Sequence, residues 1–408
     1  MNTDTNKEFV RQWEIISRGA VEIIPEAEFK ERLKKAIEDN VPLRIKQGFD
    51  PTAPDIHIGH TVGIRKLKQF QELGHKIILI IGDYTGLVGD PSGRSATRPQ
   101  LSYETIRANA ETYQKQFFKI LDKAATEVHY NGEWFSKMSF KEIMELASKF
   151  TVARMLERDD FEKRYRSGNP ISIHEMFYPL MQAYDSVAIK ADVEIGATEQ
   201  KFNLLTGREI QLDYGVRPQM ILTLPVLVGL DGQNRMSKSL GNYIGIDESA
   251  SEIFGKVMSI PDNLIYSYFE LTTDLRQDEL SQVKSLLENS AENPMNLKKK
   301  LGETLVRMYH SADAAKEARE EFEKVFSRKE IPDEIPEYDC RKYNGKVWIV
   351  RLLTDAGLVS SNSEARRLIA AGGVYLNQAK VTDDNHEIPL SDGMLVKVGK
   401  RKFLRLRT

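Results

Sequence analysis

The stretch KIILIIGDY, Lys76–Tyr84, is a near-continuous apolar run and decides the fold. Such a run is typical of a strand that is buried on both faces of a parallel sheet. The segment before it, Gly59–Leu73, carries apolar residues at the spacing of an amphipathic helix, and Gly74 closes it. PLRIKQGF, Pro42–Phe49, reads as an earlier strand. Strand, helix and strand at this spacing predict a βαβ unit with a right-handed crossover.

The loop GFDPTAPDIHIGH, Gly48–His60, connects the first strand to the helix. Parallel sheets bind ligands at the carboxyl ends of their strands, so the loop is a candidate site. Its two histidines, His57 and His60, do not make a zinc site, which needs three or four ligands. The other five histidines show no clustered ligand spacing, so we predict no metal site. A helix entrance attracts phosphate, and Gly59 lets a bulky group approach the backbone. The sequence therefore favours imidazole donors to a phosphate or a developing charge.

The rest of the chain predicts an α/β protein with several domains. Residues 100–190 and 249–326 read as mostly helical, and Met220–Leu230 returns to strand character. The stretch Arg328–Asp339 is polar and twice broken by proline, which indicates a linker. We expect a Rossmann-like parallel-sheet domain with a helical insertion over 1–245, a helical domain over 246–327, a linker over 328–345 and a small α+β domain over 346–408.

Composition and charge limit the possible functions. The 408 residues carry a net charge of −2, and 41% are hydrophobic, which leaves ample material for a core. No run is long and apolar enough to span a membrane, and the N-terminus lacks the apolar core of a secretory signal. Cys340 is the only cysteine, which fits a reducing compartment, so we expect a cytoplasmic protein. Residues 341–408 hold 13 Lys or Arg against 6 Asp or Glu, which indicates either a polyanion partner or a solvated charged face.

A second basic loop, LDGQNRMSKSLGN at Leu230–Asn242, follows a predicted strand. Together, HIGH at His57–His60 and RMSKS at Arg235–Ser239 resemble the two signatures of the class I aminoacyl-tRNA synthetases, with Arg at the first KMSKS position. The resemblance implies that ATP is a substrate, with Mg²⁺ carried on its phosphates. It implies catalytic roles for His57, His60, Arg235 and Lys238. It implies ATP contacts from Asp50, Thr52, His57, Gly59, His60, Met236 and Lys238.

The stretch YPLMQAYD places Tyr178, Gln182 and Asp185 on one face of a helix. A glutamine and an aspartate on an apolar stripe are costly without partners, which a bound amino acid would supply. The stretch resembles the tyrosine-binding helix of the tyrosyl-tRNA synthetases. Gly82–Arg98 and Glu194–Asn203 resemble two further segments of that family. The implied tyrosine-binding residues are Asp90, Tyr178, Gln182, Asp185 and Gln200.

Four residues besides Arg235 depart from the family pattern. Lys46 and Gln47 stand where other bacterial members carry Tyr-Cys, Ala197 replaces the usual second glycine of its segment, and Glu199 replaces the usual aspartate before Gln200. These departures concern the contacts of the amino acid ring and the ribose.

The C-terminal segment carries its own signals. Ser361 and Glu364 predict a capping box, and the helix after them should end at Gly372. Met394–Arg407 reads as a basic hairpin that turns near Gly399–Lys400. The segment resembles the S-four-type RNA-binding domain, which implies RNA contacts from Arg366, Arg367, Lys400, Arg401 and Lys402.

The chain is therefore identified as a member of the long bacterial subgroup of tyrosyl-tRNA synthetases. The resemblance implies tyrosine and tRNA(Tyr) as substrates, a tRNA-contacting role for residues 246–327, and a homodimer. Two alternatives are a tryptophanyl-tRNA synthetase, which shares the catalytic motifs, and a non-catalytic descendant that binds structured RNA.

Overall fold

The computed structural model describes residues 3–52, 55–92, 101–289, 292–327, 335–343, 345–377, 379–399 and 402–408. The chain forms two compact units, Met1–Ser311 and Ala312–Thr408. This division falls inside the expected helical domain, because residues 312–327 belong to the second unit. The two units are described separately below.

A six-stranded sheet forms the centre of the first unit, in the order β1-β6-β5-β2-β3-β4. Neighbouring strands are parallel except β1, which pairs antiparallel with β6 at one edge. The parallel sheet confirms the predicted α/β, Rossmann-like fold class. The strands are β1 (Glu22–Ile24), β2 (Arg44–Phe49), β3 (Lys76–Ile81), β4 (Thr126–Tyr130), β5 (Val193–Ala197) and β6 (Met220–Leu224).

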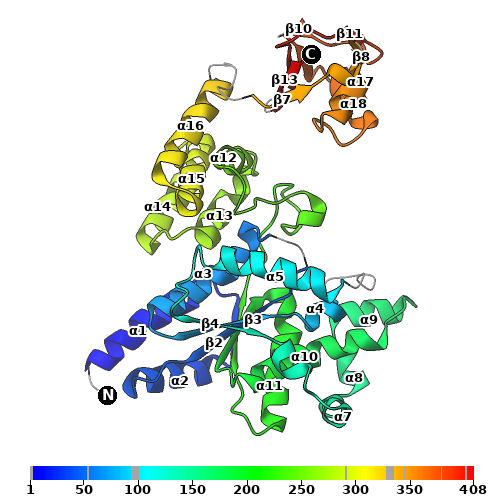
Figure 1. Cartoon of the computed structure of the whole chain (residues 1–408). Helices are drawn as coiled ribbons and strands as arrows, with labels where there is room; N and C mark the ends of the chain where they lie inside the picture. The colour runs from blue at the N-terminus through cyan, green and yellow to red at the C-terminus, as the bar shows by residue number, and fades with distance from the viewer. Residues whose placement is uncertain are drawn as a thin grey trace. The chain divides into compact units, whose positions relative to one another are not determined.

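Helices cover both faces of this sheet, with α3 and α5 on one side and α10 and α11 on the other (Figure 1). Helices α12 to α15 follow β6 along the chain. The helices of this unit are α1 (Thr3–Ser17), α2 (Glu26–Glu38), α3 (Ile58–Glu72), α4 (Thr85–Val88), α5 (Tyr103–Phe117), α6 (Gly132–Phe135), α7 (Phe140–Ser148), α8 (Val152–Met155), α9 (Asp159–Arg166), α10 (Phe177–Ala188), α11 (Lys201–Asp213), α12 (Ala250–Val257), α13 (Ile265–Thr272), α14 (Gln277–Glu288) and α15 (Pro294–Tyr309). Its short 3₁₀ helices are η1 (Ile173–Met176), η2 (Thr198–Gln200), η3 (Lys238–Leu240) and η4 (Asp262–Leu264).

Burial explains why β3 was readable from the sequence and β4 was not. Five of the six residues of β3 are buried, so the strand reads as an apolar run. The five residues of β4 are all half-buried, because β4 lies at the edge of the sheet. Its sequence, TEVHY, therefore lacks that run, and the stretch was expected to be mostly helical.

The strand order places a crevice beside β2. Strands β2 and β5 are neighbours in the sheet, but the strand that follows β2 lies on one side of this pair and the strand that follows β5 lies on the other. Parallel sheets bind ligands at such a switch point, outside the carboxyl ends of the strands. The loops after β2 and β5, which contain His57 and Gln200, both begin there.

The second unit contains α16 and a small α+β module. Its five-stranded sheet has the order β10-β9-β12-β13-β7, and β11 pairs with β8 in a second sheet. Its elements are α16 (Ala312–Ser327), β7 (Glu337–Asp339), η5 (Arg341–Tyr343), β8 (Lys346–Trp348), α17 (Ile349–Asp355), α18 (Asn362–Ala370), β9 (Val374–Leu376), β10 (Ala379–Lys380), β11 (Glu387–Pro389), β12 (Leu395–Val398) and β13 (Lys402–Arg407).

The expected linker over 328–345 differs from the structure at its C-terminal end. Strand β7 pairs in parallel with β13, and the nearby Cys340 is buried in the module core. The module therefore includes residues before Lys346. The two prolines indicated a linker, but the stretch ends in the short strand β7, whose partner β13 lies far along the chain. Residues 328–334 lie outside the described ranges.

Candidate active site

A cavity of about 750 Å³ opens at the carboxyl ends of β2, β3, β5 and β6. The structure brings to this one cavity every residue that the sequence assigned to tyrosine or ATP. These residues are Asp50, Thr52, His57, Gly59, His60, Asp90, Tyr178, Gln182, Asp185, Gln200, Arg235, Met236 and Lys238.

His57 and His60 cap the N-terminus of α3 through their Nδ1 atoms. The backbone N–H of Gly59 donates to His57 Nδ1, and the backbone N–H of His57 donates to His60 Nδ1, both at 3.2 Å. Removal from water, with His60 and Lys238 nearby, lowers the pKa of His57 to about 2. Removal from water, with Lys238, lowers the pKa of His60 to about 4. Each ring is therefore neutral and carries its proton on Nε2, which can donate a hydrogen bond.

Gly59 is required by this arrangement. A Cβ at this position would lie 2.9 Å from the His57 ring, where real Cβ atoms do not sit. A side chain at position 59 would therefore displace the ring from the helix entrance.

The RMSKS residues lie on the rim of the same cavity. The Lys238 Nζ is 3.3 Å from Asp55 Oδ2 and 5.8 Å from the centre of the Tyr243 ring. The Arg235 guanidinium donates to both carboxylate oxygens of Glu199 at 2.8 Å. Two departures from the family pattern, Arg235 and Glu199, therefore contact each other.

Asp185 is 3% exposed and is held by two neutral donors. Trp134 Nε1 donates to its Oδ1 at 3.0 Å, and Asn131 Nδ2 donates to its Oδ2 at 3.3 Å. Burial raises the pKa of Asp185 to about 7, although the charge of Lys46 opposes the rise.

Asp90 has a different environment. Ser92 donates to Asp90 Oδ1 from its backbone N–H and its hydroxyl, and Gln200 Nε2 donates to Asp90 Oδ2 at 2.7 Å. The Arg158 guanidinium is 3.3 Å from Oδ1. Burial opposes ionisation of Asp90, but the Arg158 charge and these hydrogen bonds outweigh it and lower the pKa of Asp90.

Tyr178 and Gln182 both present oxygens on the side of the cavity formed by α10. The Tyr178 hydroxyl donates to Asp50 Oδ2 at 2.8 Å, so toward another group it acts as an acceptor. Gln182 Nε2 donates to Glu194, and Gln182 Oε1 accepts from Asn203 at 3.0 Å. Pro179 lies in the first turn of α10, where proline does not break a helix.

Lys46 and Gln47 point to different sides of β2. Lys46 is fully buried behind α10, where its Nζ is 3.0 Å from Glu194 and donates to Ser186 Oγ at 2.7 Å. Gln47 lines the cavity, and its buried Oε1 has no hydrogen-bond partner among the described residues. Position 47, and not position 46, therefore faces the cavity in this chain.

Sequence reasoning missed four residues that hold the predicted ones in place, namely Asn131, Trp134, Arg158 and Asn203, and it did not predict the supporting role of Lys46. One of them had a usable signal. Asn131 directly follows β4, so recognising that strand would have put Asn131 at the carboxyl edge of the sheet. The others act through partners distant in sequence, such as Asp90 for Arg158.

The residues predicted to contact RNA lie on the second unit. Arg366 and Arg367 are exposed on α18, and Arg366 Nε is 3.3 Å from Asp384. Lys402 is exposed, and its Nζ donates to the Leu358 carbonyl. Lys400 and Arg401 lie outside the described residues.

The capping box predicted at the start of α18 is only half formed. Ser361 Oγ accepts from the Glu364 N–H, but the Glu364 carboxylate accepts from Ser360 instead of Ser361. Ser360 competes because its backbone N–H and its hydroxyl both donate to that carboxylate.

Across the ranges that the structure describes, no three His, Cys, Asp or Glu side chains are grouped to hold a metal ion. In the same ranges, no helix combines the length and apolarity that a bilayer crossing needs.

Two family models together match nearly the whole chain. The model of class I tRNA synthetases (W and Y) matches residues 38–327. The model of the tyrosine–tRNA ligase SYY-like C-terminal domain matches residues 328–406. The second match agrees with the start of the C-terminal module before β7.

Similar proteins carry the tyrosine name over their full length. The tyrosine–tRNA ligase of Carboxydothermus hydrogenoformans is 54% identical over 98% of each chain, and that of Geobacter sulfurreducens is 53% identical over 97% of this chain and 98% of its own. In fold, the tyrosyl-tRNA synthetase of Archaeoglobus fulgidus, solved with L-tyrosine, aligns with a TM-score of 0.62 at 24% identity over 76% of this chain and 99% of its own. The tryptophanyl alternative has less support, because the full-length relatives are tyrosine–tRNA ligases. The chain belongs to the tyrosine–tRNA ligases, within the class I tRNA synthetases.

Proposed function

We propose that the cavity binds tyrosine and ATP, forms tyrosyl-adenylate and pyrophosphate, and then passes the tyrosyl group to the terminal ribose of tRNA(Tyr). The proposal rests on one observation, which is that hydrogen-bond acceptors and donors line different sides of one cavity. Acceptors for a cation and a hydroxyl line the side of α10, while donors and cations line the side of α3 and the RMSKS loop.

Tyrosine fits the acceptor side in one orientation. Its ammonium group would lie against Asp90, Tyr178 and Gln182. Its phenol hydroxyl would reach Asp185, three residues beyond Gln182 on the same helix face. Its carboxylate would then face the ATP α-phosphate near His57 and His60.

Adenylate formation needs no protein nucleophile. A tyrosine carboxylate oxygen attacks the α-phosphorus, and the bond to the bridging oxygen breaks as pyrophosphate leaves. The two Nε2–H groups of His57 and His60 would donate to the phosphorus oxygens, where negative charge develops. Lys238, now beside Asp55, would move to the leaving phosphates, and Arg235 would assist. Mg²⁺ usually binds through substrate phosphates, so we place it on ATP, where it would offset phosphate charge.

The C-terminal module would hold the tRNA. Its support is the net charge of +7 over residues 341–408, and the proposed contacts are Arg366, Arg367 and Lys402 with Lys400 and Arg401. Deleting residues 328–408 should leave pyrophosphate exchange intact and lower tRNA charging at limiting tRNA at least tenfold. The cut precedes β7, because a cut at Lys346 would leave β7 without its sheet. Normal charging by the truncated protein would contradict the assignment.

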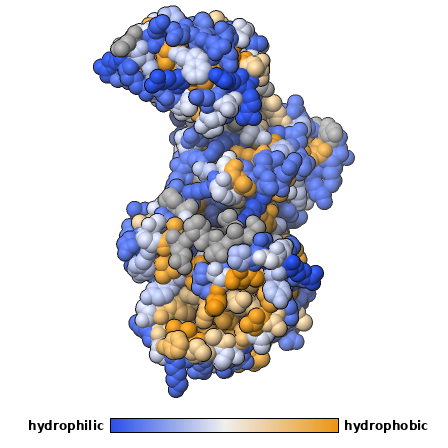
Figure 2. Space-filling view, turned by 90° about the vertical axis from the view of Figure 1, so that its right-hand side faces the viewer, coloured by the Kyte–Doolittle hydropathy of each residue, from blue (hydrophilic) through white to orange (hydrophobic). Residues whose placement is uncertain are grey.

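We also propose a cytoplasmic homodimer. Large apolar side chains are exposed along α7 to η1, including Phe140, Met144, Val152, Tyr165 and Ile173. Figure 2 faces the side of Figure 1 that carries α7, α8 and α9, and it shows apolar surface gathered over that part. A second copy of the chain would cover this surface, and a monomer by sedimentation at micromolar concentration would contradict it.

Tyrosine-dependent exchange of pyrophosphate into ATP tests the central proposal. Exchange with tyrosine supports it, exchange only with tryptophan supports the first alternative, and no exchange supports a non-catalytic RNA-binding protein. The intact set of Asp90, Gln182 and Asp185 beside both signature motifs favours the first outcome.

A further inference from the structure

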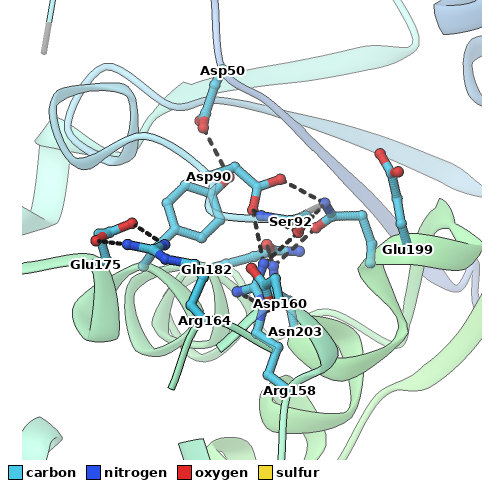
Figure 3. Close-up of polar contacts among 12 residues, drawn as sticks. Asp50, Asp90, Ser92, Arg158, Asp160, Arg164, Glu175, Gln182, Glu199 and Asn203 are labelled. Atoms are coloured by element: carbon cyan, nitrogen blue, oxygen red, sulfur yellow. Dashed lines mark hydrogen bonds and ion pairs between the residues drawn. The ribbon is translucent and has the colours of Figure 1, made fainter. Parts of the chain in front are cut away.

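Arg158 is a buried residue that lies just outside the cavity. The residue precedes α9, is 4% exposed, and does not line the cavity. Its guanidinium donates to Ser92 Oγ at 2.6 Å, to Asp90 Oδ1 at 3.3 Å and to Asn203 Oδ1 at 3.1 Å. Its Nε is 2.8 Å from Asp160. In Figure 3 the side chain points from its helix toward Asp90, Ser92 and Asn203.

Because a guanidinium only donates, Arg158 sets the orientation of the amides beyond it. Asn203 must turn its oxygen toward Arg158, so its Nδ2 faces the other way. That Nδ2 donates to Gln182 Oε1 and to Gln200 Oε1, both at 3.0 Å. Gln200 is then left with its Nε2 toward Asp90, to which it donates. The orientations of the Asn203, Gln182 and Gln200 amides therefore follow from Arg158, which can only donate hydrogen bonds.

This orientation matters for a cation in the cavity. Three donors reach Asp90 Oδ1, while Asp90 Oδ2 accepts from Gln200 and keeps a second lone pair. Gln182 Oε1, fixed by Asn203, likewise keeps a lone pair. With the amides reversed, the Gln200 oxygen would face the Asp90 carboxylate and a Gln182 N–H would face the cation, which costs buried hydrogen bonds.

We infer that Arg158 is a positioning residue for the α-ammonium group of the amino acid substrate: it holds Asp90 charged and orients Asn203, so that Gln182 and Gln200 present acceptors and donors on the correct sides. The inference rests on the proposed tyrosine site and adds a residue that touches no substrate. A purely structural role, the pairing of buried charges, would affect only stability.

Two analogues separate the ammonium group from the rest of the substrate. Tyramine keeps the ammonium and the phenol, and 3-(4-hydroxyphenyl)propionate keeps the phenol and lacks the ammonium. Both carry the phenol, so any effect of Asp185 cancels in the ratio of their inhibition constants. Arg158→Met should weaken inhibition by tyramine at least tenfold and leave inhibition by the propionate within threefold. The KM for tyrosine should rise by a similar factor, while kcat and the KM for ATP stay within threefold.

The pH dependence of that ratio supplies a second readout. Without Arg158, only the hydrogen bonds from Ser92 and Gln200 oppose the effect of burial, so Asp90 takes up a proton at a higher pH than in the wild type. Tyramine inhibition of Arg158→Met should therefore weaken further between pH 8 and pH 6, relative to wild type. The charged groups that face Asp90 are Arg158 and Asp160, whose own pKa burial raises. Adding Asp160→Asn to the Met variant should leave the trend in place.

Arg164 offers a matched control, because it lies on α9, the helix that Arg158 precedes. It is 2% exposed and donates to Glu175 at 2.8 and 2.9 Å, away from Asp90. Arg164→Met should lower the melting temperature and leave the tyramine-to-propionate ratio unchanged. Arg158→Lys can neutralise Asp90 but cannot also donate to Asn203, so it should restore the pH profile and part of the ratio.

The outcomes are distinct. If folded Arg158→Met or Arg158→Lys matches Arg164→Met, with lower stability and a wild-type analogue ratio, Arg158 is structural and the inference is wrong. If the wild-type protein shows no tyrosine-dependent exchange, the proposed function fails instead.

Discussion

Asp90 and Asp185 both line the cavity, but their electrostatic environments are opposite. Asp90 lies beside the Arg158 guanidinium, which, with hydrogen bonds from Ser92 and Gln200, outweighs burial and lowers its pKa. Asp185 is held by the neutral donors of Asn131 and Trp134, and burial raises its pKa to about 7. The carboxylate of Asp90 is thus kept charged, whereas the carboxylate of Asp185 is a poorly solvated acceptor.

The difference teaches which part of a substrate each region suits. A charge that is always present binds an ammonium group at any pH near neutrality. A buried acceptor without a cation binds a hydroxyl, and it penalises a ligand that leaves it unpaired. The predictions below break or sharpen this contrast, from the largest expected effect to the smallest.

Lys238→Ala should leave both aspartate regions untouched and slow adenylate formation by roughly 10²–10³-fold, as for the loss of one preorganised donor. The reason is its place on the RMSKS rim, away from the tyrosine contacts. Pre-steady-state adenylate formation at saturating ATP measures the rate, and equilibrium dialysis measures tyrosine binding. Weakened tyrosine binding with an unchanged rate would contradict this separation.

Asp90→Asn should lower kcat/KM for tyrosine by roughly 10²-fold, because it removes the charge opposite the ammonium and leaves Arg158 unpaired. Inhibition by 3-(4-hydroxyphenyl)propionate should not change. If both ligands weaken equally, Asp90 supports the whole cavity and has no special role for the ammonium.

The preference for tyrosine over phenylalanine should depend on pH. In the proposed site, the ionised Asp185 above pH 7 would accept a hydrogen bond from the phenol and disfavour phenylalanine. Below pH 7 a protonated Asp185 would be a weaker acceptor and would disfavour phenylalanine less. The ratio of kcat/KM values should therefore fall between pH 8 and pH 6, by up to about tenfold per pH unit below 7. A ratio that is flat with pH would mean that Asp185 does not titrate in this range.

The sequence predicted those features that depend on local pattern. The apolar run of β3 and the amphipathic spacing of α3 mark the βαβ unit, and helical spacing places Tyr178, Gln182 and Asp185 on one face. These features need only neighbours along the chain, so they were readable without a structure.

Features made by distant partners were not readable. Arg158 sits in a stretch for which the sequence predicted only mostly helical structure, and its role follows from its contact with Asp90, 68 residues away. Lys46 lies in a strand that faces the crevice, yet its side chain turns away from it to Glu194. Strand β7 was hidden because its partner β13 lies at the other end of the module.

The central claim is that Asp185 reads the substrate hydroxyl, and Asp185→Asn tests it directly. The folded-state pKa of Asp185, about 7, lies above its unfolded value near 4, so the ionised side chain costs stability as pH rises between them. The Asn variant should therefore melt no earlier than wild type at pH 8.

The measurement is kcat/KM for tyrosine and for phenylalanine in pyrophosphate exchange at pH 8, together with a melting curve. Tyrosyl-tRNA synthetases discriminate against phenylalanine by a factor of about 10⁵. The account predicts that Asp185→Asn loses tyrosine activity and narrows the gap to phenylalanine without a loss of stability. A variant that melts early and keeps the wild-type ratio would make Asp185 a structural residue and would contradict the account.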